Sequence, residues 1–268
     1  MYLGVDYYPE QWVQLGAAMV DEDMARMRDS GMNIIRIGEF AWHMMEATEG
    51  KFDFSFFDDV IEKAKRHGLN VMFGTPTATF PAWLAKAHPS ILSHRAPGQA
   101  HAFGGRREYC FNSPVYREYA RRIVKKLVQH YADEPAIIAW QIDNEFGHEG
   151  SDQCYCDQCH HAFQAFLRDK FDDNIRTLNE AYGTIFWGQT YNDFIEIPMP
   201  TSTITTHNPA LRLDWARFRS HTMNEFANIQ ISAVKALRGA HQQITHNLFG
   251  GFFNVACDQN ELVKDLDF

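Results

Sequence analysis

Two similar segments constrain the fold more than any other feature of this chain. Gly31–Gly38 (GMNIIRIG) is echoed by Gly68–Gly74 (GLNVMFG), and each copy follows a segment whose apolar residues have helical spacing. A glycine just past a helix end suits a left-handed cap, and the apolar run after it is typical of a buried strand. A helix, a short turn and a buried strand, repeated, predict the βα units of a parallel sheet.

The same pattern extends to further parts of the chain. It predicts five strands, around Leu3–Tyr7, Ile34–Gly38, Val71–Thr75, Ile137–Ile142 and Ile244–Phe249. Polar or aromatic residues follow each of them, and the clustering of such residues at one end of the strands favours a (β/α)₈ TIM barrel. The fourth strand is an apolar run that we expect to be buried on both faces. It ends abruptly in Asn144 and Glu145, where we look first for chemistry.

The segments that connect the predicted strands differ greatly in length. Long insertions are expected at about Phe80–Asn112 and at residues 147–206, and a long helix at Leu213–Leu237. Val263–Phe268 resembles a helix end that enters a sixth strand. A five-stranded sheet would expose two edges, so we expect residues 1–268 to be the amino-terminal portion, about five βα units of eight, of a longer barrel. An open doubly wound sheet is the alternative, although no G-x-G-x-x-G follows a strand.

Composition narrows the classes of partner. The net charge of −9 disfavours nucleic acid and anionic membrane surfaces. The sequence shows no signal-peptide pattern and no apolar run long enough to cross a bilayer, so we expect a cytoplasmic protein. The aromatic content of 14% suits a large core, and also a pocket that stacks sugars.

Cysteines gather in the second insertion. Cys154, Cys156 and Cys159 lie within six residues, and Cys110 lies upstream. Four thiolates satisfy tetrahedral zinc and leave no open position, which predicts a structural Zn²⁺ in an inserted subdomain. Ordinary free thiols are the alternative, and His148, His160 or His161 could replace one ligand. Cys257 stands apart as a small buried residue.

Several motifs together resemble one family. They are Tyr7–Trp12 (YYPEQW), Gly38–Trp42 (GEFAW), Thr75–Thr77, Arg106–Cys110, Asp143–Gly147 and the cysteine cluster. This combination is similar to the β-galactosidases of glycoside hydrolase family 42, within a clan of (β/α)₈ retaining glycosidases. The resemblance runs along essentially all 268 residues.

The resemblance implies roles for individual residues. Glu145 matches the general acid/base, Asn144 the residue that holds the sugar 2-hydroxyl, and Arg106 a substrate-contacting arginine. Trp187 matches a pocket aromatic, and the four cysteines match a zinc cluster. The family's nucleophile, a Glu that ends a seventh strand, would lie beyond Phe268. The family also implies a β-galactoside substrate such as lactose or a galacto-oligosaccharide, and a homotrimer.

A retaining mechanism needs two carboxyl groups about 5–5.5 Å apart. We expect burial and a negative nucleophile to raise the pKa of Glu145 when sugar is bound. Strand alternation predicts that Asp143 points away from the side of its neighbours in the strand, and no spacing places Glu10 or Glu39 opposite Glu145. We therefore expect residues 1–268 alone to be inactive. The alternatives are a zinc-stabilised module without turnover, a catalytic metalloenzyme, and a related enzyme that acts on β-glucosides or β-mannans.

Overall fold

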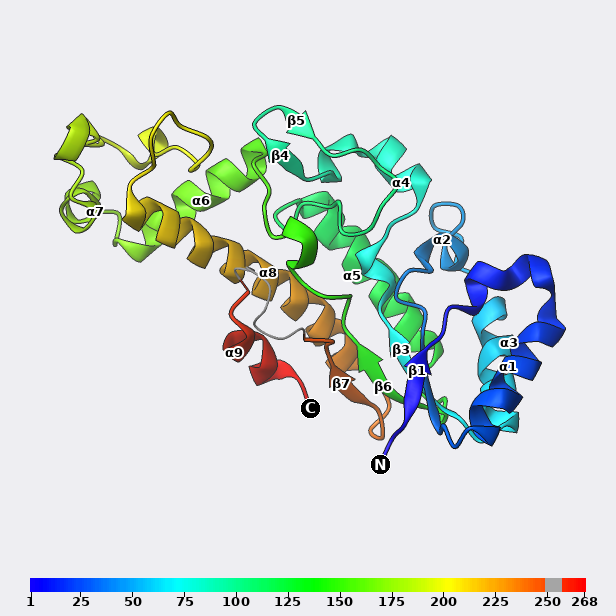
Figure 1. The fold of residues 1–268 in the computed structure, drawn as a ribbon. Helices are drawn as coiled ribbons and strands as arrows, with labels where there is room; N and C mark the ends of the chain where they lie inside the picture. Colours follow the sequence, from blue (N-terminus) through cyan, green and yellow to red (C-terminus); the bar gives the residue numbers. More distant parts are fainter. Residues whose placement is uncertain (249–256) are drawn as a thin grey trace.

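The computed structural model describes residues 1–248 and 257–268 (Figure 1). The strands are β1 Gly4–Asp6, β2 Ile34–Ile37, β3 Asn70–Gly74, β4 His94–Ala96, β5 Gln99–Ala100, β6 Ile137–Gln141 and β7 Gln243–Thr245. The α-helices are α1 Ala17–Asp29, α2 Trp42–Met45, α3 Ser55–Arg66, α4 Ala82–Ala87, α5 Pro114–His130, α6 Asp157–Lys170, α7 Ile175–Tyr182, α8 Pro209–Leu237 and α9 Gln259–Leu262. Short 3₁₀ helices are η1 Pro9–Leu15, η2 Pro76–Ala78, η3 Pro89–Ile91, η4 His148–Gly150, η5 Phe186–Gly188, η6 Phe194–Glu196 and η7 Val263–Asp265.

One parallel sheet organises the chain. Its strand order is β1-β2-β3-β6-β7, with Gly4 opposite Ile34 and Ile34 opposite Asn70. The sequence therefore predicted the five strands and their direction correctly. Within the described residues β3 has the expected length but begins one residue earlier, and the other four strands are one or two residues shorter than expected. The last residue of the fifth predicted strand, Phe249, lies outside the described residues. The two remaining strands, β4 and β5, form an antiparallel hairpin in the first insertion.

The repeated glycines act as the sequence predicted. Gly31 follows the end of α1 and Gly68 follows the end of α3, and their φ angles are +84° and +71°. A residue with a Cβ is strained in this left-handed conformation, whereas glycine adopts it freely. Each glycine therefore lets the helix stop and the chain turn at once into the next strand.

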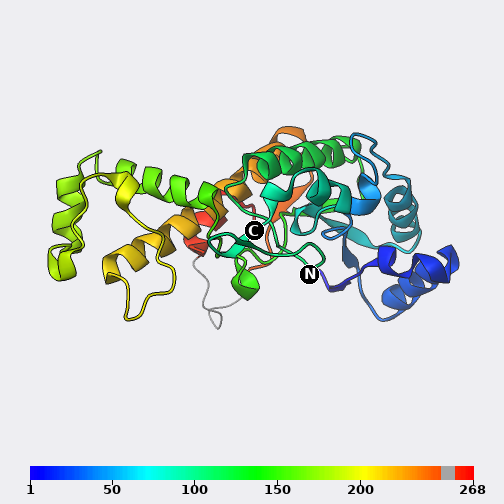
Figure 2. The same ribbon diagram turned by 90° about the horizontal axis from the view of Figure 1, so that it is seen from above.

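The two faces of the sheet differ in burial. Ile35 and Val71 are fully buried, whereas Ile34 and Met72 on the opposite face of the same strands remain partly exposed. The covered face packs against the helices, and α5 also packs on α8 and α1 on α3 (Figures 1 and 2). Only β6 approaches the burial on both faces that the sequence predicted, with Ile138 its one partly exposed residue.

Helix α8 joins two parts of the molecule. It begins at Pro209, four residues before the predicted start, because the Asn208 side chain accepts hydrogen bonds from the first turn. This N-cap satisfies backbone N–H groups that would otherwise lack partners. The carboxyl half of α8 packs in the main core, and its amino half packs in a second core.

The second core belongs to the insertion at residues 147–206. It contains the four clustered cysteines together with apolar side chains of α6, α7 and η6, and Leu211, Trp215 and Phe218 of α8 close it. In Figures 1 and 2 this part projects from the sheet as an arm. The inserted segment thus has a core of its own.

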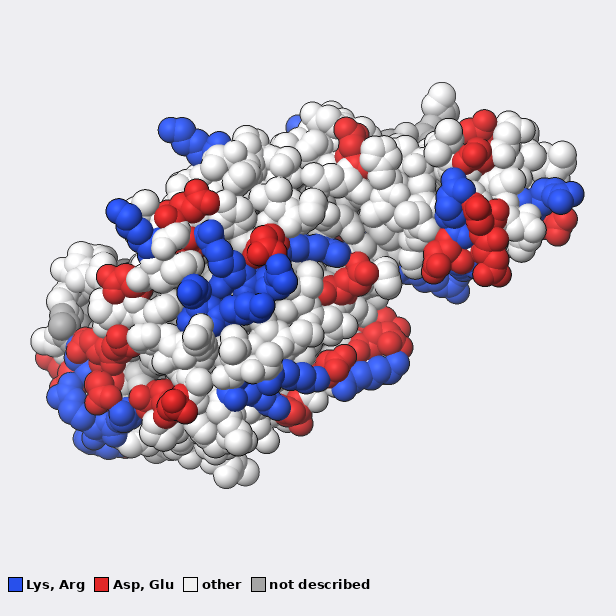
Figure 3. Space-filling view, turned by 180° about the vertical axis from the view of Figure 1, so that it is seen from behind, with Lys and Arg blue, Asp and Glu red and all other residues white. Residues whose placement is uncertain are grey.

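Charged side chains form clusters on the back of the molecule, among larger areas of other residues (Figure 3). Basic side chains gather near the middle of that face, and acidic ones border them (Figure 3). Ion pairs join some neighbouring elements, such as Arg117 on α5 and Glu225 on α8 at 3.0 Å. A surface of interspersed signs is typical of solvated helices.

The chain runs back alongside β7 at its carboxyl end. The predicted helix end is present as η7, and the Asp267 backbone N–H then donates to the Ile244 carbonyl at 2.8 Å. The three residues after η7 do not form the predicted sixth strand. None of the helices in the described ranges combines the length and apolar character needed to cross a bilayer.

Candidate active site

The turn after β6 has an unusual backbone. The strand ends at Gln141, and both Asp143 and Glu145 have positive φ angles, of +51° and +47°. Such conformations cost about 1–3 kcal/mol each in residues other than glycine, and they cluster at active sites. Asp143 lies beyond the end of the strand, so strand alternation does not apply to it, and its hydrogen bonds decide where it points.

Asp143 is a fully buried carboxyl. It accepts hydrogen bonds from the Tyr109 hydroxyl at 3.0 Å, from the Thr77 hydroxyl at 2.5 Å and from the Asn144 backbone N–H at 2.7 Å. Burial raises its pKa, and these donors work against that rise. The contacts fasten the turn after β6 to the end of β3, so Asp143 holds the backbone from which the next two side chains project.

Asn144 links the ends of β6 and β7. Its Oδ1 accepts a hydrogen bond from Asn247 Nδ2 at 2.8 Å, and Asn247 Oδ1 accepts from the Glu145 backbone N–H at 3.0 Å. The Asn144 side chain is buried, and its Nδ2 has no partner among the described residues. A buried amide donor without a partner is costly. This atom is therefore suited to an acceptor that a ligand would bring.

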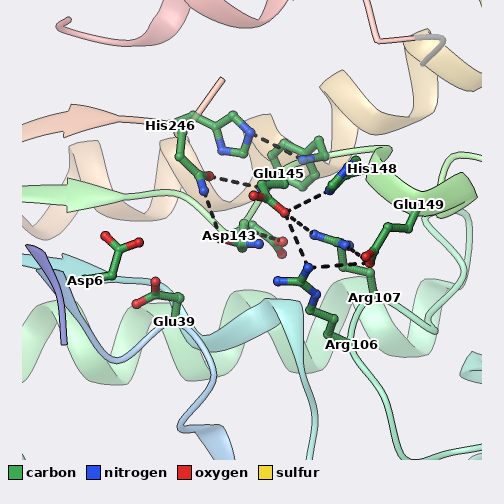
Figure 4. Close-up of polar contacts among 12 residues, drawn as sticks. Asp6, Glu39, Arg106, Arg107, Asp143, Glu145, His148, Glu149 and His246 are labelled. Atoms are coloured by element: carbon green, nitrogen blue, oxygen red, sulfur yellow. Dashed lines mark hydrogen bonds and ion pairs between the residues drawn. The ribbon is translucent and has the colours of Figure 1, made fainter. Parts of the chain in front are cut away.

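Glu145 has two unlike oxygens (Figure 4). Its Oε2 lies 2.8 Å from Arg107 Nη1, 3.1 Å from His148 Nδ1 and 3.8 Å from Arg106 Nη2. Its Oε1 has no hydrogen-bond partner among the described residues, and the side chain is 28% exposed. One oxygen is thus held in place while the other can meet a substrate.

The neighbours of Glu145 in this structure lower its pKa. Burial alone would raise its pKa, but the hydrogen bonds from Arg107 and His148 and the charges of Arg107 and Arg106 outweigh burial and lower it. The raised pKa expected from the sequence concerns the sugar-bound site with its nucleophile, and it stays a prediction. A proton donor at this position needs something to offset the two arginines.

Arg107 is a site residue that the sequence did not predict. Its side chain is 1% exposed and contacts both Glu145 and Glu149, whereas Arg106 is 40% exposed and lies farther from Glu145. The only signal in the sequence was that two arginines are adjacent. Which of them turns inward depends on the positive φ of Arg107, +63°, which a sequence does not display.

A second polar group joins the ends of β1, β2 and β6. Glu39 is fully buried, and its Oε1 accepts hydrogen bonds from Tyr8 and from Arg36 Nε, both at 3.0 Å. Arg36 also pairs with Asp6 at 2.7 Å and donates to Gln141 Oε1 at 2.8 Å. Polar side chains from three strands of the sheet are thus tied together on its less covered face.

Glu10 lies in η1, which follows β1. It is 8% exposed, and neither of its carboxyl oxygens has a partner among the described residues. Burial raises the pKa of Glu10 to about 7, and the negative charge of Glu39 adds to the rise. Glu10 is therefore a carboxyl that keeps its proton far more readily than Glu145 does.

The four predicted zinc ligands come together. All four sulfur atoms of Cys110, Cys154, Cys156 and Cys159 lie within 4.8 Å of one another, and Cys110 Sγ is 3.4 Å from Cys159 Sγ. A Zn–S bond of about 2.3 Å places tetrahedral sulfurs about 3.8 Å apart, so the donor set fits zinc. His160, a possible substitute, contacts the Ile197 carbonyl instead.

Trp187 is the predicted site residue that the structure does not bring to Glu145. It is 64% exposed and contacts Phe186, with ring centroids 4.7 Å apart. Its segment lies near α7, in the arm that projects away from the ends of the strands (Figures 1 and 2). Its role in substrate binding stays a prediction.

Comparisons with known proteins agree along the whole chain. The sequence profile of a family described as Beta-galactosidase, glycoside hydrolase family 42, matches residues 6–268. A beta-galactosidase of Thermus thermophilus is 42% identical over 99% of this chain and 40% of its own length. The crystal structure of a beta-galactosidase from the psychrophilic Marinomonas ef1 superposes with a TM-score of 0.93 at 37% identity, over 100% of this chain and 40% of that one.

A haloarchaeal relative gives the same result in both comparisons. The beta-galactosidase of Halorubrum lacusprofundi is 40% identical over 100% of this chain and 37% of its own length. Its solved structure has a TM-score of 0.93 to this one. The chain thus spans about 40% of the length of the relatives it matches.

Proposed function

The chain belongs to glycoside hydrolase family 42, the beta-galactosidase family, and on this basis we propose that it supplies the acid/base half of a retaining β-galactosidase site. The observation that supports this most is Glu145 itself. It stands at the end of a central parallel strand, with Oε2 held by Arg107 and Oε1 open to a substrate. Active sites of parallel α/β proteins form at this edge of the sheet.

The proposed chemistry assigns one task to each side chain. Glu145 protonates the leaving glycosidic oxygen and later removes a proton from the attacking water. The unpaired Nδ2 of Asn144 donates to the sugar 2-hydroxyl, a hydrogen bond that can strengthen in the transition state. Arg106, which is 40% exposed beside Glu145, contacts the substrate.

We propose that the nucleophile is a Glu from a seventh strand outside these 268 residues. Five parallel strands form an open sheet, and apolar side chains on and beside its first strand, Leu3 and Val5, are 56% and 38% exposed. Three further βα units would cover this edge and close a (β/α)₈ barrel. The length of the relatives, of which this chain spans about 40%, supports the same proposal.

We propose that the cysteine cluster binds a structural Zn²⁺. Four thiolates fill the coordination of the ion, so it would cross-link the arm to Cys110 and would take no part in catalysis. Metal analysis of the purified protein should find one zinc per chain, and Cys156→Ser should lower the melting temperature. A protein without zinc, or a variant of unchanged stability, would rule this out. Cys257→Ser, which alters a thiol outside the cluster, is the matched control.

Assembly, location and substrate rest on the family resemblance. We propose a cytoplasmic homotrimer that acts on lactose or galacto-oligosaccharides. The five free cysteines suit a reducing compartment. A monomer in sedimentation analysis would contradict the proposed trimer.

The decisive experiment is Glu145→Gln in the complete protein that contains this chain. We expect turnover of lactose to fall by about 10²–10⁴-fold, because general acid catalysis contributes that much. A dinitrophenyl β-galactoside should lose far less in its first step, since its leaving group needs no proton. Azide should restore turnover by replacing the base-assisted water.

The control is Glu225→Gln, which removes a comparable carboxylate from an ion pair with Arg117 on the helical side. Wild-type turnover of lactose by the Glu145 variant would refute the assignment. Faster turnover of β-glucosides or β-mannosides than of β-galactosides by the wild type would move the substrate class to a related enzyme.

A further inference from the structure

Glu149 lies beside the acid/base without touching it directly. It sits in η4 with a positive φ of +56°, and its Oε2 contacts Arg107 Nη2 and lies 3.5 Å from Arg106 Nη2. In Figure 4 the two guanidinium groups lie between the carboxylates of Glu145 and Glu149. Two cations are therefore shared between two anions.

We propose that Glu149 is a positioning residue that competes with Glu145 for Arg106 and Arg107 and thereby keeps the acid/base able to carry a proton. The proposal rests on the proposed function of Glu145. A retaining glycosidase needs this group as an acid in its first step and as a base in its second. Two arginines that faced Glu145 alone would favour the carboxylate and penalise the first step.

The charge count supports this sharing. Each guanidinium stays protonated at every relevant pH, so the pair presents a fixed double positive charge to Glu145. The carboxylate of Glu149 cancels part of that field at the distance of a direct ion pair with Arg107. With Glu149 neutral, both arginines would be free to orient on Glu145 Oε2.

Arg107 and Glu149 differ strongly in side-chain exposure. Arg107 is 1% exposed, so its buried charge depends on the carboxylates that pair with it. Glu149 is 58% exposed, so water can solvate its side chain. The amide oxygen in Glu149→Gln can still accept a hydrogen bond from Arg107 Nη2, so the substitution removes the charge without taking away that partner. A substitution at Glu149 can therefore change how the arginines are shared while Arg107 and Glu145 keep their positions.

The other ionisable groups that face Glu145 do not supply the same balance. His148, on the same short helix as Glu149, contacts Glu145 Oε2 and adds to the donors. His246, beyond β7, is buried, which lowers its pKa to about 4 and leaves it neutral near pH 7. Asp143 is engaged by Thr77 and Tyr109. Among the described residues, Glu149 is the anion other than Glu145 that pairs with both arginines.

The test is Glu149→Gln in the complete protein, read as the pH profile of kcat/KM. With lactose, the basic limb should move to lower pH, because Glu145 would lose its proton more readily. The value of kcat/KM should fall about threefold on that limb and should not change on the plateau. With a dinitrophenyl β-galactoside the limb should not move, because that substrate needs no acid. Glu149→Asp keeps the charge and should restore the wild-type profile, and Glu225→Gln should leave it unchanged.

Two outcomes overturn the proposal while sparing the function of Glu145. One is an unmoved basic limb for lactose in Glu149→Gln, and the other is an equal shift for both substrates. A carbon-13 NMR titration of the Glu145 carboxyl, assigned with Glu145→Gln, reads the same effect without turnover. If the wild type cleaves no galactoside, the proposed function fails, and this titration still decides whether Glu149 acts on Glu145.

Discussion

Glu145 and Glu10 are two carboxyls that follow strands of one parallel sheet, yet their proton affinities move in opposite directions. Glu145 follows β6 and meets Arg107, Arg106 and His148, which together lower its pKa. Glu10 follows β1 and meets no partner among the described residues, so burial raises its pKa to about 7. The same topological position therefore yields an acid that readily ionises and one that resists ionisation.

The difference shows what a strand end does and does not decide. Parallel strands bring both side chains to one edge of the sheet, but the loops supply the charges. Glu145 receives Arg106 and Arg107 from the first insertion and Glu149 from the second. The charged group that acts on Glu10 is Glu39, which follows the neighbouring strand and is negative. Insertions are thus where this fold sets its acid–base chemistry.

The largest effect that separates the two carboxyls is expected from Glu10→Gln. The folded pKa, raised from 4.5 to about 7, means that the folded state binds the proton more tightly than the unfolded chain. The stability from this group is full below pH 4.5 and is lost as the pH rises through 7. The amide has no such loss, so the variant should be more stable above that range by up to about 3 kcal/mol.

Denaturant unfolding of the complete protein across this pH range measures the effect of Glu10→Gln. Glu22→Gln is the matched control, because Glu22 is 68% exposed in a surface ion pair on α1. A Glu10 variant whose stability follows the wild type at every pH would show that the Glu10 carboxyl finds a partner, and the contrast with Glu145 would disappear.

The fold was largely predictable because its signals are local. Helical spacing, a glycine after each helix and an apolar run determine each βα unit, and they located all five strands of the sheet. What failed was the burial of the strands: Ile34 and Met72 face a side that these residues do not cover. Burial of a strand depends on which elements lie against it, and hydrophobicity of the strand alone does not reveal them.

The site was predictable at its centre and not at its edges. Asn144 and Glu145 were located by the polar step after an apolar strand, and the four thiols by their spacing. Arg107 and Glu149 were missed because each takes a left-handed backbone conformation in a loop. Trp187 shows the converse: it was chosen by resemblance, and it lies exposed in the arm. Loop conformation decides these contacts, and residue type alone does not fix it.

Glu145→Gln is expected to change the free energy of unfolding less than Glu10→Gln does, and in the opposite direction. Its lowered pKa means that the folded state stabilises the carboxylate through Arg107 and His148. That stability is present above the unfolded pKa and is lost as the pH falls through the folded one. The variant should therefore be less stable near neutral pH and should lose less on acidification, whereas Glu10→Gln gains on the alkaline side. Equal pH slopes for wild type and variant in denaturant unfolding would mean that Arg107 pairs with Glu149 alone.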